Sequence, residues 1–122
     1  MSDIIKTEVS IDMTSITNKI EELLNDDAVM TEVHTEFANI IDPWVPYDTG
    51  NLSKDITIDA SGVVYNADYA AKQYYGTEFN HKTEVHPLAT AHWDQVAMQT
   101  EKEVLAAKVR EILIRRINSG ND

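Results

Sequence analysis

The spacing of hydrophobic residues constrains the fold of this chain most strongly, because it changes from one period to another. Residues 4–11 alternate between apolar and polar, with Ile5, Val9 and Ile11 on one face, which predicts a short β-strand. From Asp12 onward the apolar residues recur every three or four positions, which predicts a helix with Asp12 as its N-cap. The apolar stripe of that helix comprises Met13, Ile16, Ile20, Leu23 and Leu24.

A second helix is predicted directly after the first. Asn25, Asp26 and Asp27 break the first helix and are suited to cap the next one. Pro43 ends the second helix, because proline disfavours helical geometry at the residue before it. Its apolar face comprises Val29, Met30, Val33, Phe37, Ile40 and Ile41.

The middle of the chain returns to the two-residue period. After a predicted loop from Pro43 to Gly50, the alternation of Ile56, Ile58 and Val64 predicts a hairpin of two strands over residues 54–60 and 62–66. A short helix over residues 67–75 follows, with Gly76 as its C-cap. The polar segment from Thr77 to Pro87 is predicted to be a surface loop.

The last predicted helix, over residues 88–118, is apolar on more than one side. Trp93, Ala97 and Val104 share one line, and a second line follows Met98, Leu105, Val109 and Ile112. Near the end of the helix, Ile112, Leu113, Ile114 and Ile117 surround it. A helix of this kind has more than one packing partner, and in a short chain we expect the second partner to be another subunit. The whole pattern predicts an α+β fold, in which a small antiparallel sheet packs with the N-terminal helices and a long C-terminal helix.

Length and composition are those of a small globular protein. With 122 residues, 43% hydrophobic and 25% charged, the chain is expected to form a single domain over residues 1–122. It has no cysteine, which excludes disulfides, thiol catalysis and cysteine-ligated zinc. The N-terminus lacks the basic start and long apolar run of a secretion signal, and no stretch reaches the length of a membrane span. We therefore expect a soluble product of the cytoplasm that does not contact a membrane.

The formal net charge of −11 is large for this length. Tight binding of nucleic acid comes mostly from Lys and Arg that neutralise phosphates, so this charge disfavours it. It suits a protein that is simply soluble, or one that lines a passage through which DNA slides without sticking.

The histidines are the candidates for metal or base chemistry, and they form no familiar pattern. His34, His81, His86 and His92 are the four, and of these His86 and His92 could reach a common metal with Asp94 or Glu84. Their spacing differs from known zinc patterns, so solvent-facing histidines are the simpler interpretation. The helical carboxylates Glu21, Glu22, Glu32, Glu36, Glu101 and Glu103 fall on predicted outer faces. No glycine-rich phosphate loop or nucleophile elbow is present, so we predict no enzymatic activity and no cofactor.

Two motifs are better suited to protein contacts. The turn Tyr47, Asp48, Thr49, Gly50 and Asn51 is a candidate docking loop, and it also has the composition of a helix-capping turn. Tyrosine favours interfaces because it buries a large ring and keeps a polar tip, and four tyrosines lie within eleven residues. Core packing is expected to account for two of them. The predicted interface residues are therefore the turn 47–51, the tyrosines Tyr65, Tyr69, Tyr74 and Tyr75, and the last-helix residues Trp93, Ile112, Leu113 and Ile117.

These motifs, taken in order, resemble the minor capsid or tail-completion proteins of long-tailed bacteriophages, which are head–tail joining (neck) components. The resemblance covers roughly residues 43–117. It rests on the turn Pro46–Leu52, the strand that ends Val63–Asn66, the stretch Asp68–Gly76, and His92, Trp93 and Asp94 at the start of the last helix.

The resemblance implies a structural virion protein that assembles as a ring between head and tail. It implies sixfold or twelvefold symmetry, contacts with portal or adaptor proteins and with tail proteins, and DNA that passes without specific binding. The loops 43–50 and 77–87 are then the candidates for axial contacts. A tail-terminator ring is the alternative within this class. From other classes, a small metal-dependent hydrolase that uses His86 and His92, or an acidic regulatory protein of the toxin–antitoxin kind, stays open.

Overall fold

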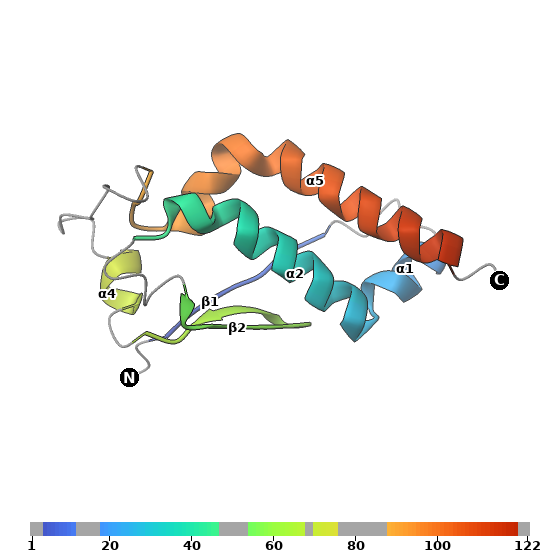
Figure 1. Cartoon of the computed structure of the whole chain (residues 1–122), viewed down its shortest axis with the longest axis horizontal. Helices are drawn as coiled ribbons and strands as arrows, with labels where there is room; N and C mark the ends of the chain where they lie inside the picture. The colour runs from blue at the N-terminus through green and yellow to red at the C-terminus, as the bar shows by residue number, and fades with distance from the viewer. Residues whose placement is uncertain (1–3, 12–17, 47–53, 68–69, 76–87, 120–122) are drawn as a thin grey trace.

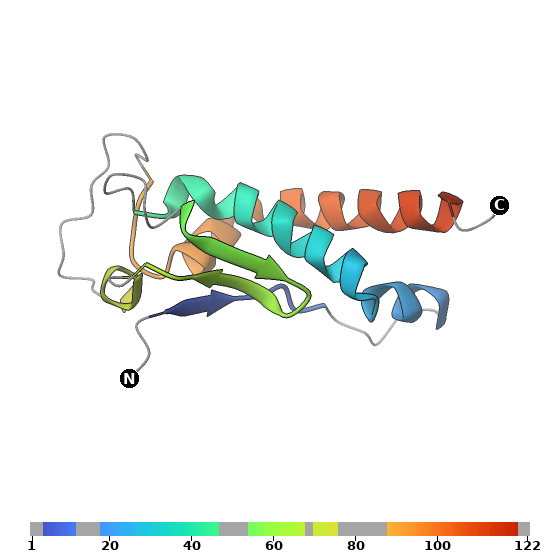
Figure 2. The ribbon, with the colours of Figure 1, turned by 60° about the horizontal axis from the view of Figure 1, so that its bottom comes forward.

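A computed structural model describes residues 4–11, 18–46, 54–67, 70–75 and 88–119 of the chain. Within these ranges α2 lies between α5 and the sheet (Figures 1 and 2). The predicted α+β fold is confirmed. The elements are β1 (Ile5–Thr7), α1 (Asn18–Leu24), α2 (Asp27–Ile41), the 3-10 helix η1 (Asp42–Trp44), β2 (Ile56–Asp59), β3 (Gly62–Tyr65), α4 (Ala70–Tyr75) and α5 (Trp93–Ser119).

The sheet has three antiparallel strands in the order β1-β3-β2. Tyr65 in the central strand pairs with Ile5 on one side and Ile56 on the other, so the apolar residues of all three strands share the face toward α2. The predicted hairpin is confirmed. Its Gly62 has φ of 150°, and a Cβ there would lie 2.3 Å from the carbonyl oxygen of Thr7, so the close approach of β1 requires glycine.

The first strand is shorter than the alternation predicts. Only Ile5–Thr7 pairs with β3, whereas the pattern extends over residues 4–11. The backbone N–H of Val9 donates instead to Nε2 of His34 in α2, at 3.0 Å, so the chain leaves the sheet after Thr7. Alternation marks which side chains face inward, but the length of the partner strand decides how many residues can pair.

The second helix forms as its sequence predicts. Asp26 is its N-cap, and the carboxylate accepts hydrogen bonds from the backbone N–H groups of Ala28 and Val29. The helix ends at Ile41, and Pro43 lies in η1 immediately after it. The predicted apolar face points into the core, with Val29, Val33, Phe37 and Ile41 buried and Met30 and Ile40 half-buried.

The last helix begins at Trp93 rather than at residue 88. His92 has φ of 48°, a left-handed conformation that a right-handed helix does not contain. Two hydrogen bonds fix the segment before α5, from Thr90 N–H to the carbonyl of Trp44 at 3.0 Å and from His92 N–H to that of Tyr74 at 2.8 Å. The helix start is therefore set by contacts with η1 and α4.

Two groups of buried side chains form the core. The larger group joins the sheet, α2, η1, α4 and the first turns of α5, and the smaller one joins Val29 and Val33 of α2 to Ile112 of α5. Within the described residues no helix combines the length and the apolar character needed to cross a membrane.

Several sequence predictions lie outside the described residues. They are the Asp12 N-cap, the Gly76 C-cap, the turn 47–51 and the loop from Thr77 to Pro87.

Candidate interaction surfaces

Three of the predicted interface residues form the centre of an aromatic cluster at the start of α5. Trp93 is fully buried and packs edge-to-face on Tyr65 and Tyr74, with ring centroids 5.2 and 4.8 Å apart. The hydroxyl of Tyr74 donates to Oδ1 of Asp94 at 2.5 Å. Burial raises the pKa of Tyr74, and the neighbouring Asp94 carboxylate raises it further. Packing within one chain accounts for all three aromatic rings, and their contact with another subunit stays a prediction.

Tyr75 is the one tyrosine of this cluster with a mostly exposed side chain, at 63%. Its ring packs against Tyr74 and His92, with centroids 5.1 and 5.7 Å away, so two neighbours hold the ring in place while most of it faces outward. A large ring held rigidly at the surface loses little conformational entropy when a partner covers it. Tyr75 is therefore the strongest surface candidate among the predicted tyrosines, while Tyr69 lies outside the described residues.

His92 completes the aromatic cluster, which we define as Tyr65, Tyr74, Tyr75, His92 and Trp93. Its ring is half-buried and packs on Tyr74 at 4.7 Å, and within the described ranges its Nδ1 is buried without a hydrogen-bond partner. The expectation from the sequence that the histidine side chains face solvent is therefore wrong for His92. Its positive φ, noted above, gives no signal in the sequence, because it depends on the bond to α4.

The second half of α5 carries apolar side chains toward α2. Its other side carries both charged and apolar side chains. Ile112 is buried against Val29 and Val33, and Leu113 packs on the same group while remaining half-buried. Ile117 is half-buried, whereas Ile114 is 52% exposed. Much of the apolar surface that the sequence assigns to another subunit is thus covered by this chain's own α2. The interface role of Ile112, Leu113 and Ile117 stays a prediction.

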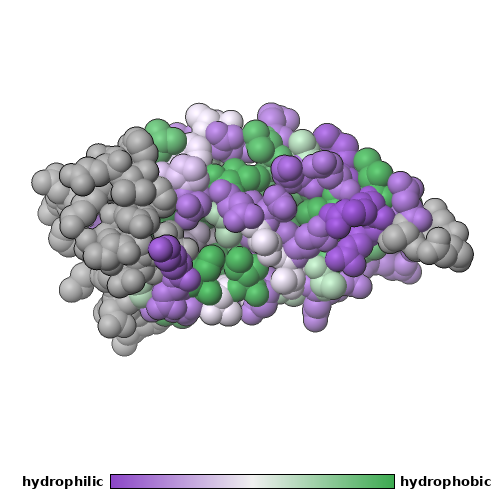
Figure 3. Space-filling view, in the orientation of Figure 1, coloured by the Kyte–Doolittle hydropathy of each residue, from purple (hydrophilic) through white to green (hydrophobic). Residues whose placement is uncertain are grey.

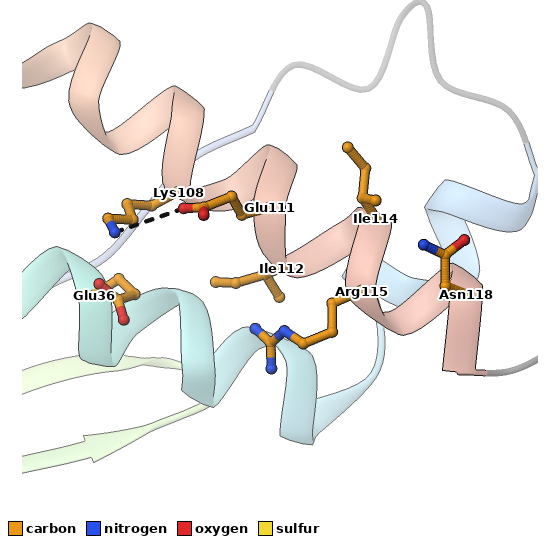
Figure 4. A pocket seen from close by; sticks show the side chains of 7 residues that line it. All are labelled: Glu36, Lys108, Glu111, Ile112, Ile114, Arg115 and Asn118. Atoms are coloured by element: carbon orange, nitrogen blue, oxygen red, sulfur yellow. Dashed lines mark ion pairs between the residues drawn. The ribbon is translucent and has the colours of Figure 1, made fainter.

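A shallow groove of about 800 Å³ runs between α2 and the second half of α5 (Figure 4). Its charged side chains alternate in sign, and Lys108 pairs with Glu111 through Nζ and Oε2 at 3.6 Å. Figure 3 shows hydrophilic and hydrophobic side chains interspersed over this face of the molecule. We call this surface the α2–α5 groove, and its lining residues are Glu36, Lys108, Glu111, Ile112, Ile114, Arg115 and Asn118.

An ion-pair clamp closes α2 onto α5 beside this groove. The Glu32 carboxylate binds both Arg115 and Arg116, the latter through Nη2 at 3.0 Å. The hydrogen bond from Arg115 lowers the pKa of Glu32, and Arg116 acts in the same direction. The helical repeat predicts Glu32 on an outer face and gives no sign of this clamp, because its partners lie more than 80 residues away.

A buried histidine joins three elements, which the sequence did not predict. His34 of α2 is 1% exposed; its Nε2 accepts from the Val9 N–H, and its Nδ1 lies 3.1 Å from the carbonyl oxygen of Asp59 at the hairpin turn. These contacts require the neutral tautomer with hydrogen on Nδ1. Burial lowers the pKa of His34, which favours that neutral form.

No metal-binding arrangement occurs in the described ranges, where no group of three or more His, Asp or Glu side chains could hold an ion. His86 lies outside those ranges, so the hydrolase alternative is not tested at that residue. In the described ranges the candidate contact surfaces are the exposed ring of Tyr75 and the α2–α5 groove.

The comparison with protein families gave a match. A family model described as minor capsid protein matches residues 6–109, which is most of the chain. The match runs from β1 through α2 and the aromatic cluster to Val109 in α5. Searches of curated proteins and of solved structures gave no match.

Proposed function

The chain belongs to the minor capsid protein family and is a structural protein of a bacteriophage virion, and within that role we propose that it forms a ring in the neck. The ring joins the DNA-filled head to the tail. The single observation that carries the proposal is the family match over residues 6–109, since it places the chain among virion components.

Two features of the molecule support a ring rather than a single copy. Tyr75 offers an exposed aromatic ring that two neighbouring rings hold in place, and α5 carries a further exposed apolar side chain at Val104. A closed ring needs two different contact surfaces on each subunit, because each copy contacts its neighbours in a head-to-tail manner. The turn 47–51, Tyr69 and the segments 43–50 and 77–87, predicted from the sequence as loops, are the proposed contacts with the portal, adaptor and tail proteins.

The charge of the chain supports a passage for DNA. A net charge of −11 repels phosphates, so DNA could move along such a surface without specific binding. We expect the isolated protein to bind duplex DNA no more tightly than another acidic protein of its size. Fluorescence anisotropy with a labelled duplex measures this, and salt-sensitive submicromolar affinity would contradict the role in lining the passage.

The test of the ring's place is electron microscopy of particles from a phage with an early stop codon in this gene. We expect filled heads beside detached, full-length tails, and normal particles when the intact gene is supplied from a plasmid. Tails with a frayed or irregular head-proximal end would assign the protein to the tail-terminator layer instead. Intact, infectious particles without the protein would contradict both positions.

A further inference from the structure

The α2–α5 groove carries a charge pattern that is complementary to itself. Lys108, Glu111, Arg115 and Asn118 follow one another at spacings of three or four residues, so they lie within roughly 80° of arc on one side of α5. Figure 4 shows all four side chains projecting from α5, with Arg115 directed toward α2. Their signs run positive, negative, positive and neutral.

Reversing the direction of a second copy brings opposite charges together. An antiparallel α5 centred at residue 113 places Glu111 opposite Arg115 of the partner copy, and Arg115 opposite its Glu111. The same centre places Lys108 opposite the partner's Asn118, whose amide oxygen can accept from the ammonium group. A parallel copy in register would instead set each charge against its like, which destabilises a helix pair.

The groove is also the place where two such acidic chains can approach. The chain has a net charge of −11, but the groove holds two acids, Glu36 and Glu111, and two bases, Lys108 and Arg115. Charges beyond about 10 Å are largely screened at 0.1 M salt, so this balanced surface governs the contact. The exposed Ile114, one residue from the centre, adds apolar area that pairing would remove from water.

The bonds within one chain leave donors for a second carboxylate. Arg115 binds Glu32 through Nη2, and a guanidinium group has five N–H donors. Glu32 keeps Arg115 in place beside the groove, and Glu36 of α2 and Glu111 of α5 line the same groove. The clamp therefore orients a base that can serve both its own chain and a neighbour.

We propose that two copies of the chain pair about a two-fold axis through the second half of α5, with crossed Glu111–Arg115 ion pairs. This contact differs from the neighbour contacts of the proposed ring. In a ring each subunit contacts the next one head-to-tail, so no two-fold axis relates two adjacent subunits. It joins two free copies of the chain. A contact over three to four helical turns is small, so the pairing is weak and concentration-dependent.

Sedimentation equilibrium of the isolated protein in about 0.1 M salt tests the pairing, with concentrations from about 10 μM to 1 mM chosen for a weak, small interface. We expect the mass to rise from that of one chain, 13.8 kDa, toward twice that value. Glu111→Arg should raise the Kd by about tenfold or more, because it sets like charges together across the axis. Arg115→Glu should do the same, and the double variant E111R/R115E should restore pairing to within about threefold of the original protein.

The matched control is Glu103→Arg, which makes the same charge change at an exposed position of α5 outside the groove. It should leave the Kd nearly unchanged. Arg115→Glu also removes a partner of Glu32, so thermal unfolding is followed for each variant. If Arg115→Glu does not fold, Glu111→Arg, which keeps the Glu32 ion pairs, is the variant that decides the test. A single-chain mass at 1 mM, equal weakening by Glu103→Arg, or no recovery in a folded double variant would overturn the proposal. Each of these results leaves the ring role open, because that role is tested on particles.

Discussion

The two halves of α5 belong to one helix but have different surroundings. In the first half the apolar side is enclosed: Trp93 and Ala97 are fully buried, and aromatic rings from β3 and α4 cover Trp93. The second half packs on one side only, where Ile112 meets α2, and its other side carries alternating charges and the exposed Ile114. The comparison shows that a helix apolar on several sides does not require a second subunit along its whole length. Where a sheet and two helices meet it, the chain itself covers those sides.

Replacing Trp93 tests this contrast with the largest expected effect. Trp93→Ala removes a fully buried ring from the aromatic cluster, and we expect the free energy of unfolding to fall by about 4 kcal/mol. Urea denaturation followed by circular dichroism measures the change. Ile114→Ala, at the exposed side of the second half, should cost about 0.5 kcal/mol or less. Equal effects of the two substitutions would contradict the contrast between the halves.

Ile112 tests the covered side of the second half. Ile112→Ala leaves a cavity against Val29 and Val33, and we expect a loss of about 3 kcal/mol in the free energy of unfolding. The same denaturation experiment applies, with Ile114→Ala again as the control from the same helix. A loss as small as that of the control would mean that α5 does not pack on α2 at this point in solution.

His34 gives the fold a pH dependence that involves neither half of α5. Its pKa is lowered by burial from the ordinary value of 6.5, although Glu8 and Asp59 oppose the shift. The unfolded chain therefore binds a proton before the folded chain does, so the free energy of unfolding falls as pH drops below about 6.5. Denaturation from pH 8 to 5 measures this, and His34→Gln should flatten the curve in that range. A wild-type curve already flat there would show that His34 is not buried in the neutral form.

Glu32 affects the free energy of unfolding in a separate, lower range of pH. Its pKa is held below 4.5 by Arg115 and Arg116, so its contribution is present above that value and is lost as pH falls through the lowered pKa. Changes between pH 6.5 and 5 can thus be assigned to His34 rather than to this clamp.

Replacing Tyr75 has the smallest expected effect on stability, in contrast to replacing the buried Trp93 of the same aromatic cluster. Since the ring is mostly exposed, Tyr75→Ala should change the free energy of unfolding by about 0.5 kcal/mol or less. If Tyr75 contacts a neighbour in the virion, the yield of infectious particles should fall although the protein remains folded. Complementation of the stop-codon phage with the variant gene measures that yield. A normal yield of infectious particles would show that Tyr75 is not part of an interface in the virion.

Much of the fold was predictable because it depends on residues close together in the chain. Asp26 caps α2 through its own next residues, and Pro43 follows the end of that helix for a local steric reason. The hairpin likewise depends on adjacent strands and a glycine at its turn. The family resemblance was carried by local motifs too, and the match over residues 6–109 confirms it.

The features that escaped prediction all join distant parts of the chain. The start of α5 at Trp93 depends on bonds to Trp44 and Tyr74, and the end of β1 depends on His34, 25 residues beyond Val9. Glu32 and His34 look like ordinary helix residues until their partners are known. A helical repeat states which side of a helix is polar, but it does not state what lies opposite.

The sequence by itself determined the secondary-structure types, the α+β class, the inward faces of the strands and of α2, and the family. Only the tertiary structure decided which predicted interface residues are covered within one chain, and which, such as Tyr75 and the edge of the α2–α5 groove, stay at the surface. The physical reason is that propensity, capping and periodicity act over a few residues, whereas burial and ion pairing depend on which elements the folded chain brings together.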